Sequence, residues 1–155
     1  MGEILEKSSN VGVAKISDKL TGEGVLTILE RFGFGEYTGA MLPGESTGDF
    51  PELDRMSFLR KRSLSFGYGI SVTTAQLARA YSVFANHGSI LDLKISKHST
   101  NRQARQVLSR TTSSQVLEML RKAVEQGTGI QAKITGYNVA GKTGTVRKSN
   151  QEGYS

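Results

Sequence analysis

The pattern of apolar and polar residues predicts a helix in the first quarter of the chain. In the stretch "TGEGVLTILERFGFG", residues 21–35, apolar side chains recur three and four positions apart. This spacing places them on one face of an α-helix, and a glycine just past the last apolar residue is typical of a helix end. We expect the helix to end at Gly33 or Gly35 and to bury Val25, Ile28, Leu29 and Phe32.

Two later helices are predicted by a Thr followed three residues on by a Gln, the pattern of a capping box. "VTTAQLARAYSVFANHG" has this pair at Thr73 and Gln76, and "TTSSQVLEMLRKAVEQG" has it at Thr112 and Gln115. Apolar residues at helical spacing follow each pair. The expected buried faces are Leu77, Ala80, Tyr81 and Phe84 in the first helix, and Val116, Leu117, Leu120 and Val124 in the second.

Shorter helices are expected at the start of the chain, before and after "KSSN". Ile4 and Leu5 indicate the end of one helix, and Ser9 or Asn10 is a suitable N-cap for the next, because their side-chain oxygens accept hydrogen bonds from free backbone N–H groups. Residues 38–66 hold both prolines and no sustained period. This composition predicts a long irregular loop, and such loops are often functional.

Strands are predicted in two places. "SILDLKIS" alternates apolar and polar residues in the manner of a strand or an extended arm, and the polar stretch "KHSTNRQARQ" after it indicates a loop. Residues 139–148 are rich in β-branched residues and glycine, which favours a strand leading into a turn. The whole chain is therefore expected to be α+β and mostly helical, with residues 1–155 in one domain.

Composition narrows the function only slightly. The 155 residues carry a formal net charge of +6, with 37% hydrophobic and 22% charged residues, as in a soluble globular protein. Positive charge alone does not choose between nucleic acid, an anionic membrane and an acidic substrate. There is no Cys, so a disulfide framework and a Cys-based metal site are excluded.

The stretch "GYNVAGKTGT", Gly136 to Thr145, fits two unrelated motifs. It matches G-x-x-x-x-G-K-[ST], a P-loop that cradles nucleotide phosphates, and it contains the K-T-G triplet of penicillin-interacting serine enzymes. A P-loop needs a buried apolar strand before it and a helix after it. Here the preceding "GTGIQAKIT" is polar and the following residues favour a strand, so the P-loop interpretation is disfavoured.

The K-T-G interpretation requires an S-x-N partner, which "KSSN" supplies as Ser8-Ser9-Asn10. Either triplet alone is weak, since Ser and Asn are ordinary caps and Lys-Thr-Gly is a common surface turn. Together with "FGYGISVTTAQLARAYSVFANHG" and "AVEQGTGIQAKITGYNVAGKTGT", they are far more specific. From residue 4 to the end, the chain resembles the transpeptidase domain of class B penicillin-binding proteins, most closely the cell-division (septal) type.

The resemblance implies a role for each motif residue in cross-linking peptidoglycan stem peptides, a reaction that passes through an acyl-enzyme and is blocked by β-lactams. Ser8 would relay a proton to the leaving amine, Asn10 would hold the donor peptide group, and Lys142 would place a positive charge beside Ser8. The implied substrate-binding residues are Ser9, Thr143, Gly144 and Thr145, with the Thr145 N–H forming half of the oxyanion hole. No cofactor or metal is implied.

The sequence departs from the family at the nucleophile. None of its serines is followed three residues later by a lysine, so the family's S-x-x-K motif is absent from these 155 residues. We expect the nucleophile upstream, in a parent enzyme with a single N-terminal membrane span at the periplasmic face of the bacterial inner membrane. We expect this chain alone to be inactive, and it would lack the nucleophile helix and the C-terminal strands of a partial transpeptidase fold.

The remaining features favour ordinary surface roles. An unpaired strand at 139–148 would favour self-association, because an exposed strand edge pairs with other chains. The basic run 60–62 keeps open an alternative function, a non-catalytic module that binds a partner protein or nucleic acid, although no recognition motif accompanies it. His87, His98 and the carboxylates Glu45, Asp49, Glu52 and Asp54 are interpreted as structural or solvated groups.

Overall fold

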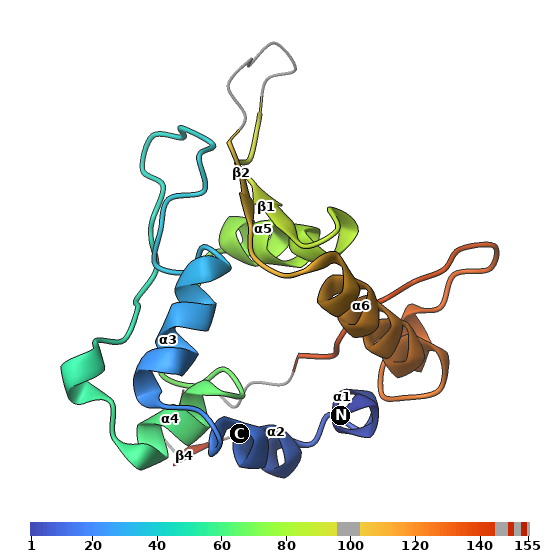
Figure 1. The fold of residues 1–155 in the computed structure, drawn as a ribbon, viewed down its shortest axis with the longest axis horizontal. Helices are drawn as coiled ribbons and strands as arrows, with labels where there is room; N and C mark the ends of the chain where they lie inside the picture. The colour runs from blue at the N-terminus through green and yellow to red at the C-terminus, as the bar shows by residue number, and fades with distance from the viewer. Residues whose placement is uncertain (96–102, 145–148, 151–152, 155) are drawn as a thin grey trace. The chain divides into compact units, whose positions relative to one another are not determined.

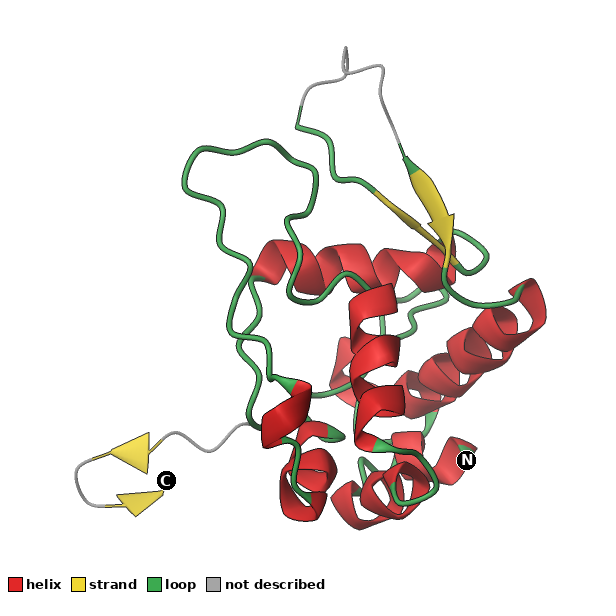
Figure 2. Cartoon of the chain, turned by 60° about the vertical axis from the view of Figure 1, so that its left-hand side comes forward, coloured by secondary structure: helices red, strands yellow, loops and turns green. Residues whose placement is uncertain are grey.

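The computed structural model describes residues 1–95, 103–144, 149–150 and 153–154. Figures 1 and 2 show a mostly helical chain, as expected from the sequence, together with short antiparallel hairpins. It divides into two compact units: unit 1 combines Met1–Ser8 with Glu118–Ser155, and unit 2 is Ser9–Leu117. The elements are α1 (Gly2–Glu6), α2 (Asn10–Ser17), α3 (Gly22–Arg31), η1 (Leu53–Arg55), α4 (Phe58–Leu64), α5 (Thr74–Ala85), β1 (Ser89–Leu91), β2 (Ala104–Gln106), α6 (Arg110–Glu125), η2 (Ile130–Ala132), β3 (Ser149–Asn150) and β4 (Gly153–Tyr154).

Side-chain caps fix where most of the helices begin. The Ser9 hydroxyl accepts a hydrogen bond from the Gly12 N–H at 3.1 Å and caps α2. The predicted capping box of α5 is confirmed, with both reciprocal bonds between Thr73 and Gln76 present. The predicted box of α6 is wrong: this helix starts at Arg110, and Ser109 accepts from the Thr112 N–H at 3.0 Å. The Ser109 hydroxyl, three residues before the predicted cap, accepts from one of the free N–H groups at the start of the helix, so the helix begins earlier than predicted.

The core of unit 2 lies in two apolar clusters. The first joins α3 and α4 through Val25, Leu26 and Leu64. The second joins α5 to the β1–β2 hairpin through Val83, Ile90 and Val107, and α5 and β1 lie side by side in Figure 1. The predicted face of α3 is partly wrong, because Leu26 is buried while Ile28 remains 45% exposed.

The buried face of α5 also differs from the prediction. Leu77 and Tyr81 are 44% and 41% exposed, whereas Gln76 and Arg79 are buried. Gln76 donates from Nε2 to two loop carbonyls at 2.9 Å each. The packed partner here is a loop rich in backbone carbonyls, and such groups require hydrogen-bond donors when buried. The polar side of α5 therefore turns inward together with Ala80.

Residues 38–66 are not irregular throughout, as the sequence suggested. They contain the short helix η1 and the helix α4, which begins where Ser57 accepts a hydrogen bond from the Arg60 N–H at 3.2 Å. Seven residues are too few to display a clear helical period, and Leu64 alone is the fully buried apolar residue of α4. Before η1, Asp49 and Ser71 form an isolated antiparallel bridge.

The predicted strand in "SILDLKIS" is confirmed over its first part as β1. The stretch predicted as a loop after it contains β2, which pairs with β1 in the register Ser89 to Gln106. The exposed side chains of β2 hide the strand from a pattern search, because no apolar alternation marks it. Gly88, at φ +93°, precedes the hairpin, and a Cβ there would lie 2.3 Å from the Leu108 carbonyl oxygen.

Unit 1 packs α1 against the end of α6 and the turns that follow it. The Thr128 N–H donates to the Glu6 carbonyl at 3.0 Å. A Cβ on Gly127 would lie 2.5 Å from the same oxygen, so this close approach requires glycine. The Gly141 N–H donates to the Leu120 carbonyl at 3.3 Å, which attaches the next segment to α6.

The strand predicted at 139–148 is not present in its described part. Residues 139–144 have no strand pairing, and residues 145–148 lie outside the described residues. A strand requires a hydrogen-bonded neighbour, and β-branched composition cannot supply one. The described part therefore gives no basis for the predicted self-association through this edge. Within the described ranges, no helix has the length and apolar character needed to cross a membrane.

Candidate functional site

Ser8 lies in the turn between α1 and α2, in an uncommon backbone conformation. Its φ is +52°, and its N–H donates to the Leu5 carbonyl at 3.2 Å. A left-handed residue at this position ends a helix, a role that glycine usually takes. Serine carries a conformational cost here of about 1 kcal/mol. The side chain is half-buried.

Lys142 contacts this serine from the other end of the chain. Its Nζ donates to Ser8 Oγ at 2.5 Å, although the two residues are 134 positions apart. The same ammonium lies 3.0 Å from the Thr143 carbonyl oxygen and 3.4 Å from Thr143 Oγ1. Both residues belong to unit 1. The first residue of the S-x-N triplet and the lysine of K-T-G are thus neighbours in space.

The position of Lys142 is set by its attachment to α6. The hydrogen bond from Gly141 to Leu120 fixes the backbone next to the lysine. Leu120 and Val124 are buried on the inner face of α6, and a Cβ on Gly141 would make ordinary contact with Val124 at 3.8 Å. The periodicity of α6 therefore determines where the K-T-G motif lies.

Burial lowers the pKa of Lys142 from its ordinary value. Removing an ammonium from water disfavours its charged form. Its contacts within the described residues are with hydroxyl and carbonyl oxygens rather than carboxylates, so no ion pair offsets the desolvation. The group is therefore suited both to donate hydrogen bonds and to exchange a proton with Ser8.

Thr128 is a site residue that the sequence analysis missed. Its hydroxyl lies 3.1 Å from the Thr143 hydroxyl, and its N–H is bonded to Glu6 in the first helix. It belongs to the "GTG" turn after α6, which in the sequence indicates only the end of a helix. The hydroxyl groups of Ser8, Thr128 and Thr143 and the ammonium of Lys142 form one polar cluster.

The structure does not bring every predicted site residue into this cluster. Ser9 and Asn10 belong to unit 2, where Ser9 caps α2 and Asn10 is its exposed first residue. Thr145 lies outside the described residues. Gly144 is exposed, and a Cβ on it would meet no atom within 4 Å, so the packing of the described chain does not itself require glycine there. The roles of these four residues in binding remain predictions.

The basic run 60–62 is not an open cationic surface. Lys61 is 8% exposed and donates to the Leu20 carbonyl at 2.7 Å. Arg62 binds both carboxylate oxygens of Asp18, which lowers the pKa of Asp18 through the hydrogen bond and the charge of Arg62. These bonds tie α2 and α4 together. The alternative of a basic binding module therefore receives no support from this run.

The candidate carboxylates and histidines do not form a site in the described part of the chain. Glu45 accepts hydrogen bonds from the N–H and hydroxyl of Thr38, which lower the pKa of Glu45. Glu52 pairs with Arg55 at 3.3 Å on the surface. No cluster of three or more metal-ligating residues occurs within the searched, described residues. His98 lies outside them.

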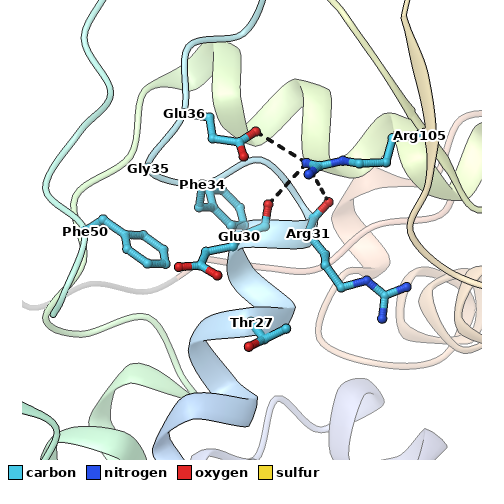
Figure 3. A pocket seen from close by; sticks show the side chains of 8 residues that line it. All are labelled: Thr27, Glu30, Arg31, Phe34, Gly35, Glu36, Phe50 and Arg105. Carbon is cyan, nitrogen blue, oxygen red and sulfur yellow. Dashed lines mark hydrogen bonds and ion pairs between the residues drawn. The ribbon is translucent and has the colours of Figure 1, made fainter. Parts of the chain in front are cut away.

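Unit 2 has a surface pocket of about 340 Å³ beside the end of α3 (Figure 3). Phe34 and Phe50 flank it, and Arg105 Nη2 lies 3.3 Å from the Glu36 carboxylate. The same nitrogen lies 3.4 Å from each of two carbonyls at the end of α3, a common way to satisfy a helix C-terminus. None of the predicted site residues lines this pocket.

Comparison with known proteins gives one consistent family. The family model described as "Penicillin binding protein transpeptidase domain" matches residues 1–155. The chain is 38% identical over 156 residues to a probable peptidoglycan D,D-transpeptidase, PbpC, of Pseudomonas aeruginosa. The aligned region covers 100% of this chain and 28% of that protein. It is 36% identical over 151 residues to the peptidoglycan D,D-transpeptidase FtsI of Escherichia coli, with 97% of this chain and 26% of that protein covered.

Comparison with solved structures identifies the same family. The apo transpeptidase domain of penicillin-binding protein 3 from Burkholderia pseudomallei matches with a TM-score of 0.90 and 32% identity, over 99% of this chain and 47% of that chain. Penicillin-binding protein 3 from Mycobacterium tuberculosis, complexed with aztreonam, matches with a TM-score of 0.89 and 34% identity, over 99% of this chain and 39% of that chain. The 155 residues thus span less than half of the proteins they resemble.

Proposed function

Because the chain belongs to the penicillin-binding-protein transpeptidase family, as a class B member, we propose that it supplies the S-x-N and K-T-G motifs of a peptidoglycan D,D-transpeptidase. The observation that carries the proposal is the 2.5 Å contact between Lys142 Nζ and Ser8 Oγ. A chance match of two short triplets would not bring their side chains together across 134 positions. In the complete site, this pair would stand beside the D-Ala-D-Ala end of a stem peptide.

The pair is suited to proton transfer during acyl transfer. Ser8 would pass a proton to the amine of the departing D-Ala, and Lys142 would stabilise the hydroxyl oxygen while the proton moves. In a site closed to water, the ammonium also attracts the terminal carboxylate of the substrate. Asn10 would hold the peptide group of the donor, since its amide offers both a donor and an acceptor.

The K-T-G segment would bind the substrate along its backbone. The hydroxyl of Thr143, already 3.4 Å from Lys142 Nζ, and that of Thr145 would bind the carboxylate. Gly144 would leave room for the substrate backbone, and the Thr145 N–H would be one donor of the oxyanion hole. Ser9 would contribute to substrate binding next to its role as a helix cap.

The nucleophile must come from a segment other than these residues. No serine of the 155 stands three positions before a lysine. We therefore propose that the chain alone does not form an acyl-enzyme with a β-lactam. The whole enzyme would act in cell-wall synthesis at the division septum, anchored at the periplasmic face of the inner membrane, together with other division proteins.

A chimeric enzyme tests the proposal. Residues 1–155 would replace the corresponding segment of the Pseudomonas aeruginosa relative, which is 38% identical over the whole chain. We expect the chimera to be labelled by a fluorescent penicillin on a denaturing gel. Lys142→Ala in the chimera should slow labelling about 100-fold, while Lys133→Ala, at an exposed position outside the cluster, should not change it. A folded chimera with no labelling, or one indifferent to Lys142→Ala, would contradict the proposal.

The isolated chain gives a second, independent test. Incubation with the same fluorescent penicillin should leave no covalently labelled band at the mass of the chain. The intact Pseudomonas aeruginosa relative serves as the positive control for the reagent. A labelled band from the isolated chain would show that the S-x-x-K serine is dispensable, and the proposed division of the site would be wrong.

A further inference from the structure

The surface pocket beside the C-terminal end of α3 has no part in the proposed transpeptidase site. Its volume is about 340 Å³, and its lining comes from the last turns of α3, the segment that follows, Phe50, and Arg105 of β2. All of these residues belong to unit 2. The pocket is therefore formed within one compact unit, and its chemistry can be considered by itself.

Two phenylalanine side chains form walls of this pocket. Phe34 and Phe50 are both half-buried, so each leaves part of its ring uncovered. Phe50 packs against the first apolar cluster of unit 2, and a Cβ on Gly35, at φ +80°, would lie 2.9 Å from the Phe50 Cγ atom. The Phe50 ring thus lies against the backbone of Gly35, a close approach that requires glycine. Packing on both sides holds this aromatic wall in place.

Among the charged groups that line the pocket, only the carboxylate of Glu30 has no partner within the described part of the chain. Arg105 Nη2 is shared between the Glu36 carboxylate and the two carbonyls at the end of α3. Arg31 donates to the Val107 carbonyl. Both cations of the lining therefore already donate to the protein, and the charged group that is left for a ligand is an acceptor.

The position of Glu30 is unfavourable for the helix that carries it. Glu30 is the next-to-last residue of α3, and the C-terminal end of a helix carries partial negative charge, which disfavours a carboxylate. The helix gains from an acidic residue only at its other end, where Glu23 lies. In the view of Figure 3, the Glu30 carboxylate lies between the side chains of Phe34 and Phe50. A bound cation would offset the charge of Glu30 and the helix dipole together.

We propose that this pocket binds the guanidinium group of an arginine side chain on a partner polypeptide. A guanidinium stacks on aromatic rings and donates two parallel hydrogen bonds to a carboxylate, and aromatic faces attract cations. The Glu30 carboxylate between two rings matches these properties. An ammonium is more strongly hydrated and does not stack, and an anion would be repelled by Glu30.

The neighbouring strand favours a polypeptide over a free amino acid. Arg105 of the lining belongs to β2, whose side chains are exposed. Within the described residues, β2 pairs with β1 on one edge and with no strand on the other. An extended polypeptide adds its own backbone hydrogen bonds along such an edge while its side chains enter nearby pockets.

The test is an NMR titration of the isotope-labelled 155-residue chain with a capped Gly-Arg-Gly tripeptide. We expect saturable shifts of the amide signals of Glu30, Phe34 and Phe50. The same tripeptide with citrulline in place of arginine keeps the shape and lacks the charge, and it should bind about 10-fold more weakly. Gly-Lys-Gly and free arginine should also bind more weakly than Gly-Arg-Gly.

Three variants of the chain locate the interaction. Glu30→Gln keeps the size of the side chain and removes its charge, so affinity for Gly-Arg-Gly should fall about 10-fold. It should not disturb the fold, because it relieves an unfavourable charge at the helix end. Glu23→Gln makes the same charge change in the first turn of α3, outside the pocket, and should not alter the affinity. Phe50→Leu keeps an apolar side chain and should weaken binding about 3-fold.

Several results would overturn the inference. These are equal affinity for the citrulline tripeptide, undiminished binding in Glu30→Gln, and a folded chain with no shifts at millimolar Gly-Arg-Gly. Lysine bound as tightly as arginine would rule out a guanidinium pocket, and free arginine bound as tightly as the tripeptide would rule out a polypeptide partner. The penicillin experiments concern residues outside this pocket, so either proposal can fail without the other.

Discussion

Cationic side chains withdrawn from water donate hydrogen bonds in both units, but the groups that accept these bonds differ between the units. In unit 2, Lys61 and Arg79 are 8% and 6% exposed, and both bind backbone carbonyls. Lys61 donates to Leu20, and Arg79 donates to Leu91 and Tyr37 and to the carboxylate of Asp92. In unit 1, Lys142 binds the hydroxyl of Ser8. The first two cations hold segments of chain together, and the third contacts a group that can exchange a proton.

The partner decides which role a buried cation has. A backbone carbonyl has no proton to give and no capacity to become a nucleophile, so its hydrogen bond contributes only to stability. A hydroxyl can lose its proton to the lysine. The burial of a lysine therefore does not by itself show whether its role is structural or chemical. The atom that it reaches determines whether it stabilises the fold or takes part in chemistry.

Loss of Arg79 should have the largest effect on stability. Arg79→Met would leave the carbonyl of Leu91 in β1, the loop carbonyl of Tyr37 and the Asp92 carboxylate without their donor. Breaking a buried charged network of this kind costs about 3–5 kcal/mol. Urea denaturation should show this loss, whereas Arg55→Met, at an exposed ion pair, should change stability by less than about 0.5 kcal/mol. Equal losses in the two variants would contradict the assignment of Arg79 as a structural cation.

The next largest effect is a difference in stability between substitutions of Lys61 and Lys142. Lys61→Met leaves the Leu20 carbonyl unpaired and removes a cation 5.6 Å from the centre of the Phe58 ring. We expect a loss of about 2 kcal/mol in the free energy of unfolding. Lys142→Met should cost less than half as much, because the half-buried Ser8 hydroxyl is open to water. A larger loss for Lys142→Met would make it the structural lysine and remove the contrast.

Ser8→Gly should raise stability. Glycine adopts positive φ without the clash that a Cβ causes, and we expect a gain of about 1 kcal/mol. Ser8→Ala is the matched comparison, since it retains the Cβ and removes only the hydroxyl. If Ser8→Gly were less stable than Ser8→Ala in thermal unfolding, the strain attributed to this turn would be absent.

The smallest effect is the pH dependence that Lys142 imposes. Its folded pKa lies below 10.5, the ordinary value for lysine. Between the two values the unfolded chain binds more protons than the folded chain, so stability rises with pH in this window. Below the folded pKa, the cost of burying the charge stays constant. The stability of the unchanged chain relative to Lys142→Met should therefore rise as pH approaches 10.5. A difference independent of pH would show that Lys142 is not desolvated.

Local features were the easiest to predict from the sequence. The capping box at Thr73 and the cap at Ser9 are confirmed, since each depends on bonds between residues three apart. The α6 cap was misplaced by three residues because Ser109, just outside the motif, competes for the same N–H groups. The strand β2 was missed because its three side chains are exposed. The inward side of α5 was misjudged because polar loop carbonyls, rather than apolar residues, pack against it.

The sequence by itself determined the family, the two motifs and the absence of S-x-x-K, because these depend only on the order of residues along the chain. The tertiary structure decided that Lys142 reaches Ser8 and that Thr128 joins them. A contact across 134 positions requires the two ends of the chain to come together. They do so because α1 is bonded to the turn that follows α6, and the segment before Lys142 is bonded to α6 itself. No pattern within a window of a few residues contains this information.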